Sequence, residues 1–490
     1  MSHLLGLARA ARLMGVSRAA LQQRIKEGNL HAMDGMITTE ELLKAYPDIS
    51  LEDAGAFEKT LKIKEEAFVR RVRERSLPPK EVLAERLFEQ GRELADVKLH
   101  LQRYHALVTG LQSDLQGLME RSGPAAREAL RQVERWVEGG LRRVLGETEA
   151  LDSLALMDDM LRVMSAHVTL RPSHHDFLVE GADSILEAGL KAGLALNYGC
   201  STGNCGLCKA RVISGQVMKI RHFDYVLTEA EKQQGYTLMC CHSPVGDVTL
   251  ETLEANSAQD IPTQQIIARV KSVQALSPDM RLLHLQTPRS SRLRFLAGQS
   301  LTLGVAGAGT AELAIASCPC DDRNLQFHVE RGQGDSFGAF VFDRLKVGDS
   351  VSLYGPWGDY LLDDESQHAL LFIAFGRGFG PTKSMVEHAL AREAAERIDL
   401  AWAAAPGGHY MVNQCRYWAD ALDNFGYRSY ELRAPDGAEM ERFAARILAD
   451  YPDAGNHAIY LAGPAEYLEP ALANLAGAGL PHARMRVIVC

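Results

Sequence analysis

The sequence contains no apolar run that approaches the roughly 20 residues needed to cross a bilayer, and its N-terminus lacks the apolar core of a signal peptide. It has no excess of basic residues either, because 53 Lys and Arg stand against 63 Asp and Glu, a formal net charge of −10. These absences argue against a membrane protein and against one that coats nucleic acid or anionic lipid. The odd count of nine cysteines argues against a disulfide framework and predicts a reducing, cytoplasmic setting.

Four of the nine cysteines stand in a spacing that has a specific chemistry. Cys200, Cys205 and Cys208 are separated by four and two residues, and Cys240 follows further along the chain. This C-x4-C-x2-C…C spacing is typical of a plant-type [2Fe–2S] site, where four thiolates hold two irons. A zinc site would more often show two C-x2-C pairs, and the spacing here contains one. We therefore predict that these four cysteines are metal ligands.

The residues around the cysteines predict a small sheet with short helices. Predicted strands lie at residues 167–171, 176–179, 209–217 and 247–251. One helix is predicted at residues 183–189, and a second, short helix is opened by a capping box that Thr228 and Glu231 form. Strands and helices together predict a compact α+β domain around the cysteines.

This pattern is similar to the β-grasp ferredoxin module of oxygenase reductases, over residues 166–256. The resemblance implies a [2Fe–2S] cluster that transfers single electrons. The family places its fourth cysteine four residues before a proline, which here is Pro244. The resemblance therefore selects Cys240 as the fourth ligand and leaves Cys241 as a packed neighbour.

The 490 residues are too many for one hydrophobic core and correspond to roughly three to five domains. The first of these, residues 1–48, resembles a winged helix-turn-helix of the MerR or excisionase type. Its helices are predicted at residues 7–13 and 17–26, its wing at 29–37, and a further capped helix opens at 38–41. The side chains of the second helix that would reach a major groove are Arg18, Gln22, Gln23, Arg24 and Lys26.

The charge of this first segment does not by itself favour DNA. Its six Lys and Arg stand against five Asp and Glu. Binding to phosphates should therefore be weak unless a dimer doubles the number of contacts. DNA binding through residues 1–48 and a module repurposed for protein contacts are both left open.

Residues 49–165 are predicted to be helical. Apolar residues repeat there with heptad spacing in two sets, Leu87, Leu94, Leu101, Val108 and Leu115, and Val97, Tyr104, Leu111 and Leu118. This spacing keeps an apolar seam facing a partner helix. We favour a coiled-coil homodimer, because a DNA reader usually needs two copies. The alternative is an intrachain hairpin with an amphipathic helix at residues 125–144, and Gly110 and Gly117 would weaken the long helix.

The remainder, residues 263–490, resembles the ferredoxin–NADP reductase superfamily. Residues 263–363 are similar to its antiparallel, flavin-type β-barrel and residues 366–490 to its Rossmann-like, nucleotide-type α/β domain. Within the second domain, residues 370–381 predict a strand, a glycine loop and a helix start, and residues 459–475 predict the last strand and helix. The resemblance implies FAD and NAD(P)H as cofactors and completes a multidomain chain of α+β and α/β parts.

The flavin signature of that superfamily is altered. The family's Ile-Ala-Ser-x-Pro run is kept at residues 315–319, but the preceding Arg-x-Tyr-Ser positions, 311–314, read Ala-Glu-Leu-Ala. The family arginine pairs with flavin phosphate, a contact worth roughly 1.5–3 kcal/mol, and Glu312 would repel that phosphate. Residues similar to the family's pyrophosphate turn are Arg331, Gly332, Gly334 and Ser336. Arg331 is a candidate for the missing cation, with an ordinary polar loop as the alternative.

The nucleotide side is altered too. Where the family shows Gly-Gly-Thr-Gly-x-x-Pro, this chain reads Phe-Gly-Arg-Gly-Phe-Gly-Pro, and Cys-Gly-Pro has become Ala-Gly-Pro. The candidate nucleotide-binding residues are Gly376, Gly378, Pro381, Gly463 and Pro464. The loop glycines still allow backbone amides to approach a phosphate at a helix start, and Arg377 would either aid an anion or fill the site. The aromatic residue common near the family's C-terminus is replaced by Cys490.

Three functions fit these motifs. The first, which we favour, is an oxidoreductase that passes electrons from NAD(P)H through flavin to the cluster and on to an acceptor protein such as an oxygenase. The second is a redox-sensing, helix-turn-helix transcriptional regulator in which the reductase module is degenerate. A docking subunit whose N-terminal half binds a partner enzyme is a third alternative. Catalytic residues beyond the cofactor sites are not predicted.

Overall fold

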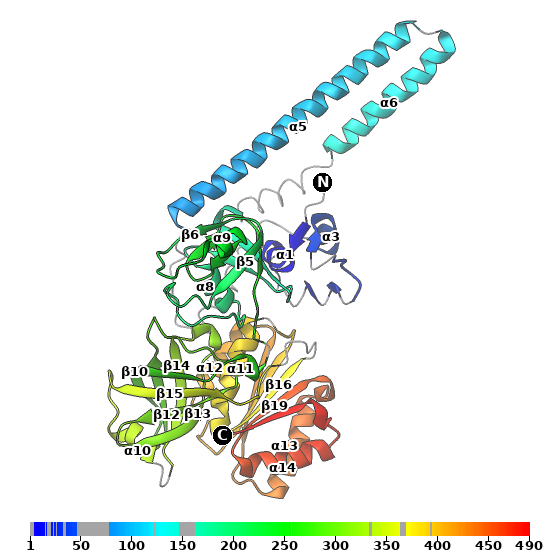
Figure 1. The fold of residues 1–490 in the computed structure, drawn as a ribbon. Coiled ribbons are helices and arrows are strands. Elements are labelled where there is room, and N and C mark those ends of the chain that lie inside the picture. The colour runs from blue at the N-terminus through cyan, green and yellow to red at the C-terminus, as the bar shows by residue number, and fades with distance from the viewer. Residues whose placement is uncertain are drawn as a thin grey trace.

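The computed structural model describes the chain in segments up to residue 146 and almost throughout from residue 162. The described residues are 4–14, 16, 21–22, 24–25, 27–32, 36–46, 78–121, 123–146, 162–255, 257–332, 336–362, 369–392 and 394–490. A central domain lies between a small N-terminal module with a projecting helical hairpin and two C-terminal domains (Figure 1). No helix in this described part is long and apolar enough to cross a membrane.

The N-terminal module pairs two short strands beside two short helices where it is described, and its assignment as a helix-turn-helix stays a prediction. Its elements are β1 (Leu4–Gly6), α1 (Leu7–Met14), β2 (Met36–Thr38) and α3 (Thr39–Ala45). β1 and β2 pair antiparallel, and Thr38 caps α3 by accepting a hydrogen bond from the backbone N–H of Glu41. Of the predicted second helix, residues 21, 22, 24 and 25 are helical and the others lie outside the described residues.

Arg24, one of the predicted groove readers, makes contacts within the module. It donates a hydrogen bond to the Ala45 carbonyl at 2.5 Å, and its guanidinium lies over the Tyr46 ring, 4.3 Å from the centroid. This side chain therefore ties the second helix to the end of α3. Of the other predicted groove readers, Gln22 is half-buried, and Arg18, Gln23 and Lys26 lie outside the described residues.

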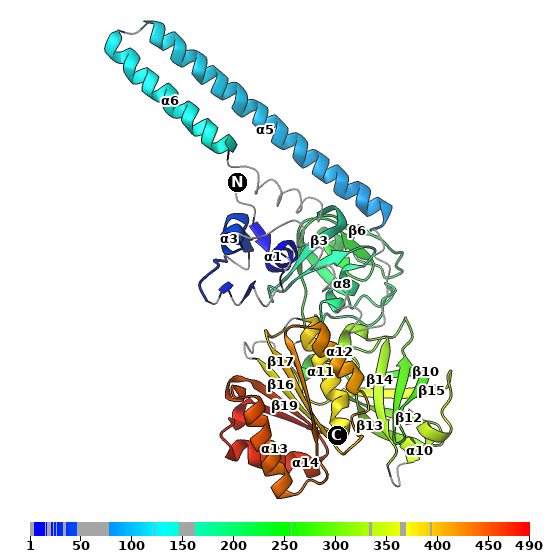
Figure 2. The same cartoon turned by 180° about the vertical axis from the view of Figure 1, so that it is seen from behind.

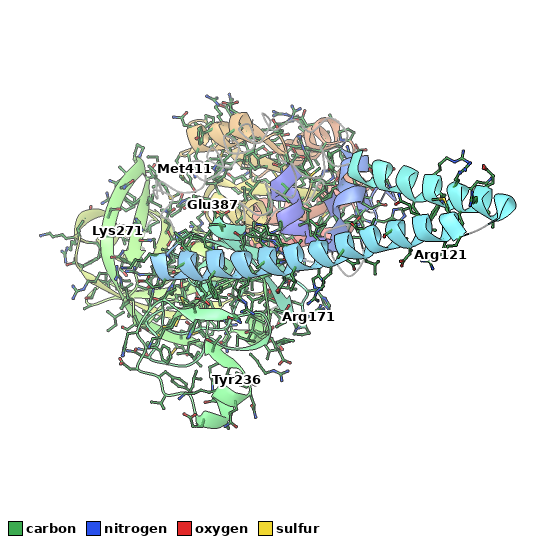
Figure 3. The ribbon with its side chains drawn as sticks, turned by 90° about the horizontal axis from the view of Figure 1, so that it is seen from above. Arg121, Arg171, Tyr236, Lys271, Glu387 and Met411 are labelled. Atoms are coloured by element: carbon green, nitrogen blue, oxygen red, sulfur yellow. The ribbon has the colours of Figure 1, made fainter. Side chains whose placement is uncertain are left out.

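A long helical hairpin follows. α5 (Lys80–Arg121) runs for 42 residues and α6 (Pro124–Gly146) returns beside it, with Arg121 near the far end of the projection (Figure 3). Gly110 and Gly117 lie inside α5 without ending it. The hairpin alternative is thus present, yet α6 leaves much of the predicted seam exposed, including Leu87, Leu94, Val97, Leu101, Tyr104, Leu111 and Leu118.

The central domain is the predicted α+β module. Its main sheet has the order β4-β3-β9-β5-β7, built from β3 (Ser165–Arg171), β4 (Asp176–Glu180), β5 (Lys209–Ser214), β7 (Tyr236–Leu238) and β9 (Val248–Glu251). β6 (Val217–Lys219) and β8 (His242–Pro244) form a separate two-stranded ribbon. The strand predicted over residues 209–217 is therefore two strands, because Gly215 has φ +84° and turns the chain.

Capping boxes fix both helices of this domain. They are α8 (Ile185–Lys191), opened by Ser184 and Glu187, and α9 (Glu229–Gln233), opened by Thr228 and Glu231. In each, the hydroxyl accepts from one backbone N–H while the carboxylate accepts from the other, which satisfies two free donors at the helix start. The second box confirms the prediction.

The first C-terminal domain is an antiparallel barrel-like sheet of order β13-β12-β15-β10-β11-β14. Its elements are β10 (Gln264–Ser277), β11 (Met280–Gln286), β12 (Ser300–Val305), β13 (Gly309–Ala314), β14 (Asn324–Glu330), α10 (Ser336–Asp343) and β15 (Ser350–Trp357). Alternate residues of β10 and β15 point into one buried cluster, as expected for strands with one solvated face.

The second C-terminal domain is a five-stranded parallel sheet of order β18-β17-β16-β19-β20. The strands are β16 (Leu370–Phe375), β17 (Ile398–Ala404), β18 (Phe425–Glu431), β19 (Ala458–Gly463) and β20 (Met485–Val489). One face is covered by α11 (Phe379–Ala391) and α12 (Val412–Ala421), the other by α13 (Gly437–Asp450) and α14 (Ala465–Gly477). Figure 2 shows this domain beside the barrel, both below the central domain.

Candidate redox site

The loops of the central domain bring the four predicted metal ligands together. Cys200 and Cys205 lie on the loop after α8, Cys208 directly precedes β5, and Cys240 lies two residues after β7. Because β5 and β7 pair beside them, the sulfur atoms of Cys208 and Cys240 lie 3.3 Å apart. The Cys200 and Cys205 thiols are hydrogen-bonded to each other. The four thiols therefore form two pairs.

Two pairs of thiols suit two irons. In the described part of the chain, no three His, Cys, Asp or Glu side chains converge as a single metal ion would require. A [2Fe–2S] centre distributes four protein ligands over its two irons, and four thiolates are the plant-type set. The residues thus fit the cluster, and their assignment as its ligands stays a prediction.

The loop directs backbone amides at the first sulfur. Burial alone would raise the pKa of the Cys200 thiol. Hydrogen bonds to its sulfur instead lower this pKa to about 6, and they come from the Cys205 thiol and the backbone N–H groups of Thr202, Asn204 and Cys205. The three backbone N–H groups would also stabilise the negative charge of a metal-bound thiolate, whereas the Cys205 thiol would lose its proton on binding metal.

Two glycines allow the loop to curl this tightly. Gly203 has φ +80°, and a Cβ there would lie 2.3 Å from the Cβ of Phe223 and 2.7 Å from the Cys241 sulfur. Gly206 has φ +74°, and a Cβ there would lie 2.3 Å from the Tyr225 ring. A larger residue at either position would therefore push the ligand loop away from the domain.

Cys241 lies behind the ligand loop. It is fully buried, with its sulfur 3.5 Å from the Cys240 sulfur and 3.9 Å from the His222 carbonyl oxygen. Cys240, by contrast, lies against Cys208. This geometry supports Cys240 as the fourth ligand and Cys241 as its packed neighbour.

The predicted flavin turn lies where β14 leads into α10. Ser336 opens α10, and its hydroxyl donates to the Ala308 carbonyl at 3.0 Å; Gly332 is exposed, and Gly334 lies outside the described residues. Arg331 pairs with Asp343 of α10 at 3.0 Å, with both side chains about half exposed. Arg331 is thus paired with a carboxylate at the surface, and its assignment as the missing cation stays a prediction.

The altered signature lies along β13. Ala311 and Leu313 pack partly against the barrel core, and Glu312 accepts a hydrogen bond from the Ser300 hydroxyl at 2.6 Å. The start of α10, with the backbone N–H of Ser336, thus fits the pyrophosphate end of FAD, because first-turn N–H groups of a helix favour an anion. The side chains of residues 311–314 offer it no cation.

The predicted nucleotide loop is the turn η3 (Gly376–Gly378) between β16 and α11. A Cβ at Gly378 would lie 2.1 Å from the Ala462 carbonyl oxygen, so this glycine allows close packing against β19. Gly376 has φ +53° and open space where a side chain would stand. Gly376 is therefore the loop position where a ligand can approach the backbone.

The other predicted nucleotide residues flank this loop. A Cβ at Gly463 would lie 2.7 Å from the Cβ of Phe375, at the end of β16. Pro464 precedes α14 as its N-cap, and Pro381 is buried in the first turn of α11. The structure thus brings the predicted nucleotide residues together at the carboxyl ends of β16 and β19. The predicted flavin turn lies separately, on the barrel.

Arg377 connects these two sets. Its Nε donates to the Cys490 carbonyl at 2.8 Å, and its Nη1 donates to the Glu330 carboxylate at 3.1 Å. Arg377 therefore links the end of β14 to the C-terminus, and both of its predicted roles, aiding an anion and filling the site, stay predictions. Burial raises the pKa of the Cys490 thiol to about 11, so this thiol stays protonated at neutral pH.

An aromatic cluster behind the glycine loop has no sequence motif to reveal it. Phe379 stacks on Trp402 with ring centroids 4.0 Å apart. His328 lies against Phe379, and its Nδ1 is hydrogen-bonded to the Tyr410 hydroxyl at 3.1 Å. Burial, aided by the charge of Lys383, lowers the pKa of His328 to about 3. Among the described residues its Nε2 has no hydrogen-bond partner, which leaves a neutral imidazole between the two domains.

The family comparisons agree with these two halves. Residues 168–245 match the 2Fe-2S iron-sulfur cluster binding domain, and residues 267–361 match the oxidoreductase FAD-binding domain. The fold and the site thus define an iron–sulfur flavoprotein.

Relatives place the chain more closely. The reductase component DmpP of phenol 2-monooxygenase from Pseudomonas sp. (strain CF600) is 30% identical over 323 residues, 64% of this chain and 90% of that protein. The CDP-6-deoxy-L-threo-D-glycero-4-hexulose-3-dehydrase reductase of Yersinia pestis is 28% identical over 264 residues, 54% of this chain and 79% of that protein. The chain belongs to the iron–sulfur flavoprotein reductase family, which includes the reductase components of oxygenases.

Members of this family pass electrons from NAD(P)H through FAD to a [2Fe–2S] cluster, and this chain is such an oxidoreductase. A solved structure, the cytochrome P450 reductase GcoB of Amycolatopsis, is 24% identical and covers 66% of this chain and 98% of its own, with a TM-score of 0.42.

Replacing each of the two neighbouring cysteines, Cys240 and Cys241, with alanine tests the ligand assignment. Cys240→Ala removes one member of the Cys208 pair and is expected to cost most of the bound iron, because one iron loses a thiolate. Cys241→Ala, the matched control, should keep wild-type iron and sulfide content and the EPR signal of dithionite-reduced protein. Iron retained in Cys240→Ala but lost in Cys241→Ala would reverse the assignment.

Restoring the family arginine tests the flavin side. Ala311→Arg is expected to tighten FAD binding about tenfold or more, since a charge-assisted contact to phosphate contributes roughly 1.5–3 kcal/mol. FAD titration, followed by quenching of flavin fluorescence, measures this. Thr310→Arg, an exposed neighbour on the same strand, is the control for added positive charge. Equal affinities for the two variants would show that position 311 does not face the phosphate.

Proposed function

We propose that Cys200, Cys205, Cys208 and Cys240 hold the [2Fe–2S] cluster of this reductase, and that an oxygenase or similar protein is its electron acceptor. The pairing of the four thiols on a domain that contacts the reductase half carries this proposal. The relatives support the choice of acceptor, because DmpP is the reductase component of a phenol monooxygenase and a Comamonas relative that of a terephthalate dioxygenase.

The chain's own residues would act at three places. Ser336 and the start of α10 would hold the pyrophosphate of FAD, and Gly376 would let the nucleotide approach the loop. The apolar rings of Phe379 and Trp402 would keep water from the space between the domains. FAD supplies the conversion of a two-electron hydride from NAD(P)H into single electrons, which is how a [2Fe–2S] centre takes them.

The cluster loop has one solvent-facing edge where an acceptor would dock. Cys205 is exposed, whereas the other three predicted ligands are buried. Leu207, two residues further on, is 51% exposed, and Val226, which follows the Tyr225 that lies against Gly206, is 80% exposed. Exposed apolar side chains beside an accessible ligand favour protein contact at this edge.

Anaerobic titration of the full-length protein tests the electron-transfer function. NADH or NADPH is expected to bleach the flavin and cluster absorbance and to produce the EPR signal of the reduced cluster. Flavin released by denaturation would give the cofactor stoichiometry. Protein that binds a cluster but no flavin, and that neither nucleotide reduces, would contradict the proposal.

One observation favours the regulator as a second candidate. The N-terminal module contacts the central domain through Arg9, whose guanidinium is almost fully buried and donates to Asp247 at 2.5 and 2.9 Å. Burial would raise the pKa of Asp247, but the charge and hydrogen bonds of Arg9 and the backbone N–H of His167 lower it. The helix-turn-helix-like module is thus joined to the segment that follows Cys240.

The root of α5 binds the same segment. Arg86 is buried and donates to the carbonyls of Pro244, Val245 and Val163, at 2.9, 2.9 and 3.0 Å. Burial lowers its pKa to about 10. Both N-terminal elements therefore contact residues 244–247, a few positions beyond the predicted fourth ligand. A regulator would show salt-sensitive binding of promoter DNA that changes when dithionite reduces the cluster.

The exposed heptad seam of α5 supports a homodimer. Replacing Leu101 and Leu111, which are 67% and 48% exposed, with Asp places charge in the seam and should convert a dimer to a monomer, because each Asp would be buried without a partner. Light scattering gives the mass. Arg103→Asp, off the seam on the same helix, should leave the mass unchanged. An unaltered mass in the double variant would rule out the coiled coil.

A further inference from the structure

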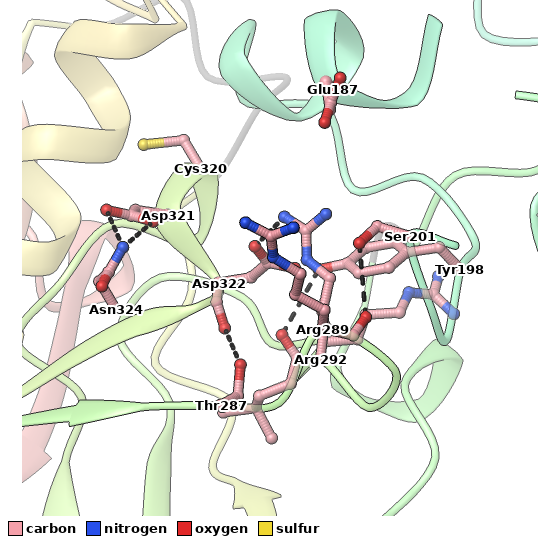
Figure 4. A network of polar contacts seen from close by, with 12 residues as sticks. Glu187, Tyr198, Ser201, Thr287, Arg289, Arg292, Cys320, Asp321, Asp322 and Asn324 are labelled. Carbon is pink, nitrogen blue, oxygen red and sulfur yellow. Dashed lines mark hydrogen bonds and ion pairs between the residues drawn. The ribbon is translucent and has the colours of Figure 1, made fainter. Parts of the chain in front are cut away.

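Hydrogen bonds connect the residues on both sides of Cys200 to the barrel. The backbone N–H of Arg292 donates to the Gly199 carbonyl at 3.2 Å, and the Tyr198 hydroxyl donates to the Leu293 carbonyl at 3.4 Å. The Ser201 hydroxyl donates to the barrel at 3.4 Å, through the carbonyl of residue 289. These contacts bracket Cys200 on both sides, and Figure 4 shows Tyr198 and Ser201 facing the barrel segment.

A buried ion pair lies directly behind these contacts. Arg292 bonds to Asp322, with side chains 10% and 1% exposed. The same guanidinium lies 5.5 Å from the centroid of the Tyr198 ring, and Thr287 donates to the Asp322 carbonyl at 3.4 Å. A carboxylate this buried is costly unless it is paired, so Asp322 fixes where Arg292, and with it the Cys200 loop, must lie.

Asp322 ends a segment whose other half is bound by the nucleotide-type domain. Lys383, Ser384 and Glu387 of α11 bond to the backbone of residues 316–318 at 3.0, 2.8 and 3.3 Å. Lys383 and Glu387 also pair with each other at 2.7 Å, both almost fully buried. Residues 316–322 therefore contact both C-terminal domains and, through Asp322 and Arg292, the cluster loop.

We propose that Arg292 and Asp322 are positioning residues that hold the Cys200 side of the cluster at a fixed separation from the flavin-side segment, and so set the rate at which electrons cross between them. The proposal rests on the proposed function and concerns one step of it. When bound, FAD would take both electrons of a hydride from NAD(P)H and release them singly, and a [2Fe–2S] cluster would accept them one at a time and pass each to the acceptor. Arg292 and Asp322 would hold the Cys200 loop in place for each transfer.

The pair is suited to this role because its removal would loosen one contact without unfolding either domain. The central domain would remain attached through its other contacts, such as the 2.7 Å bond between Arg294 and Asn197. Loss of the pair should therefore widen the range of separations that the cluster adopts.

Asp322→Asn and Arg292→Met test this in the full-length holoprotein. Anaerobic stopped-flow mixing with NADH or NADPH follows flavin reduction and cluster reduction separately. We expect flavin reduction within about twofold of wild type and cluster reduction slowed about tenfold or more, because small displacements of reacting groups cost large factors in rate. Arg292→Lys keeps the charge but not the fork of donors, and should recover part of the rate.

Matched variants separate positioning from general destabilisation. Glu251→Gln removes a carboxylate from the exposed Arg211 pair of the central domain and should leave both rates unchanged. If Asp322→Asn does not fold, Ser201→Ala and Tyr198→Phe each remove one bond from the loop side and should slow cluster reduction alone. Equal cluster rates in all folded variants would overturn the proposal. Wild-type protein that neither nucleotide reduces would instead contradict the proposed function.

Discussion

The pairing of β5 with β7 is the constraint on which the redox site depends. Lys209 lies opposite Leu238 in that ladder, so Cys208 and Cys240, one and two positions beyond, meet at its end with sulfurs 3.3 Å apart. A slip by one residue would turn every side chain of the slipped strand to the opposite face and separate the pair. The cluster therefore depends on strand register as much as on cysteine spacing, and the tight turns at Gly203 and Gly206 complete the enclosure.

The site has three sides, each facing a different part of the molecule. The Cys200 side contacts the barrel through residues 198–201. Cys205 faces solvent, and the segment after Cys240 receives Arg9 and Arg86 from the N-terminal third. The reductase half, an acceptor protein and the N-terminal module would therefore each approach the cluster from a different side. They would not compete for one surface.

Local chemistry was predictable from the sequence, and pairing between distant residues was not. The cysteine spacing, the capping box at Thr228 and the strand–loop–helix at residues 370–381 each depend on neighbours in the chain, and the structure contains all three features. The loss of the flavin arginine at position 311 is likewise visible in the sequence.

The partners of the arginines were not predictable, because each lies far along the chain. Arg331 is bound to Asp343, Arg377 links Glu330 to the C-terminus, and Arg24 binds the end of α3. A guanidinium fits any carboxylate or carbonyl that the fold places near it. The sequence therefore indicates that a cation is present and leaves its partner undetermined, which is why Arg331 and Arg377 had two readings each.

Buried charges lie at the borders between domains, and this placement has a physical consequence. Arg9 is almost fully buried and joins two modules by pairing with Asp247, whose side chain is 46% exposed. Arg292 with Asp322 and Lys383 with Glu387 are buried pairs within the barrel and within α11, and each lies beside a segment of another domain. A buried ion pair adds little net stability, because desolvation offsets most of the attraction, whereas breaking it strands an unpaired charge. Such pairs therefore discriminate against other arrangements of the same domains more than they strengthen this one. For a chain that must carry single electrons between cofactors held on separate domains, a unique arrangement matters more than added stability, since the rate depends on separation.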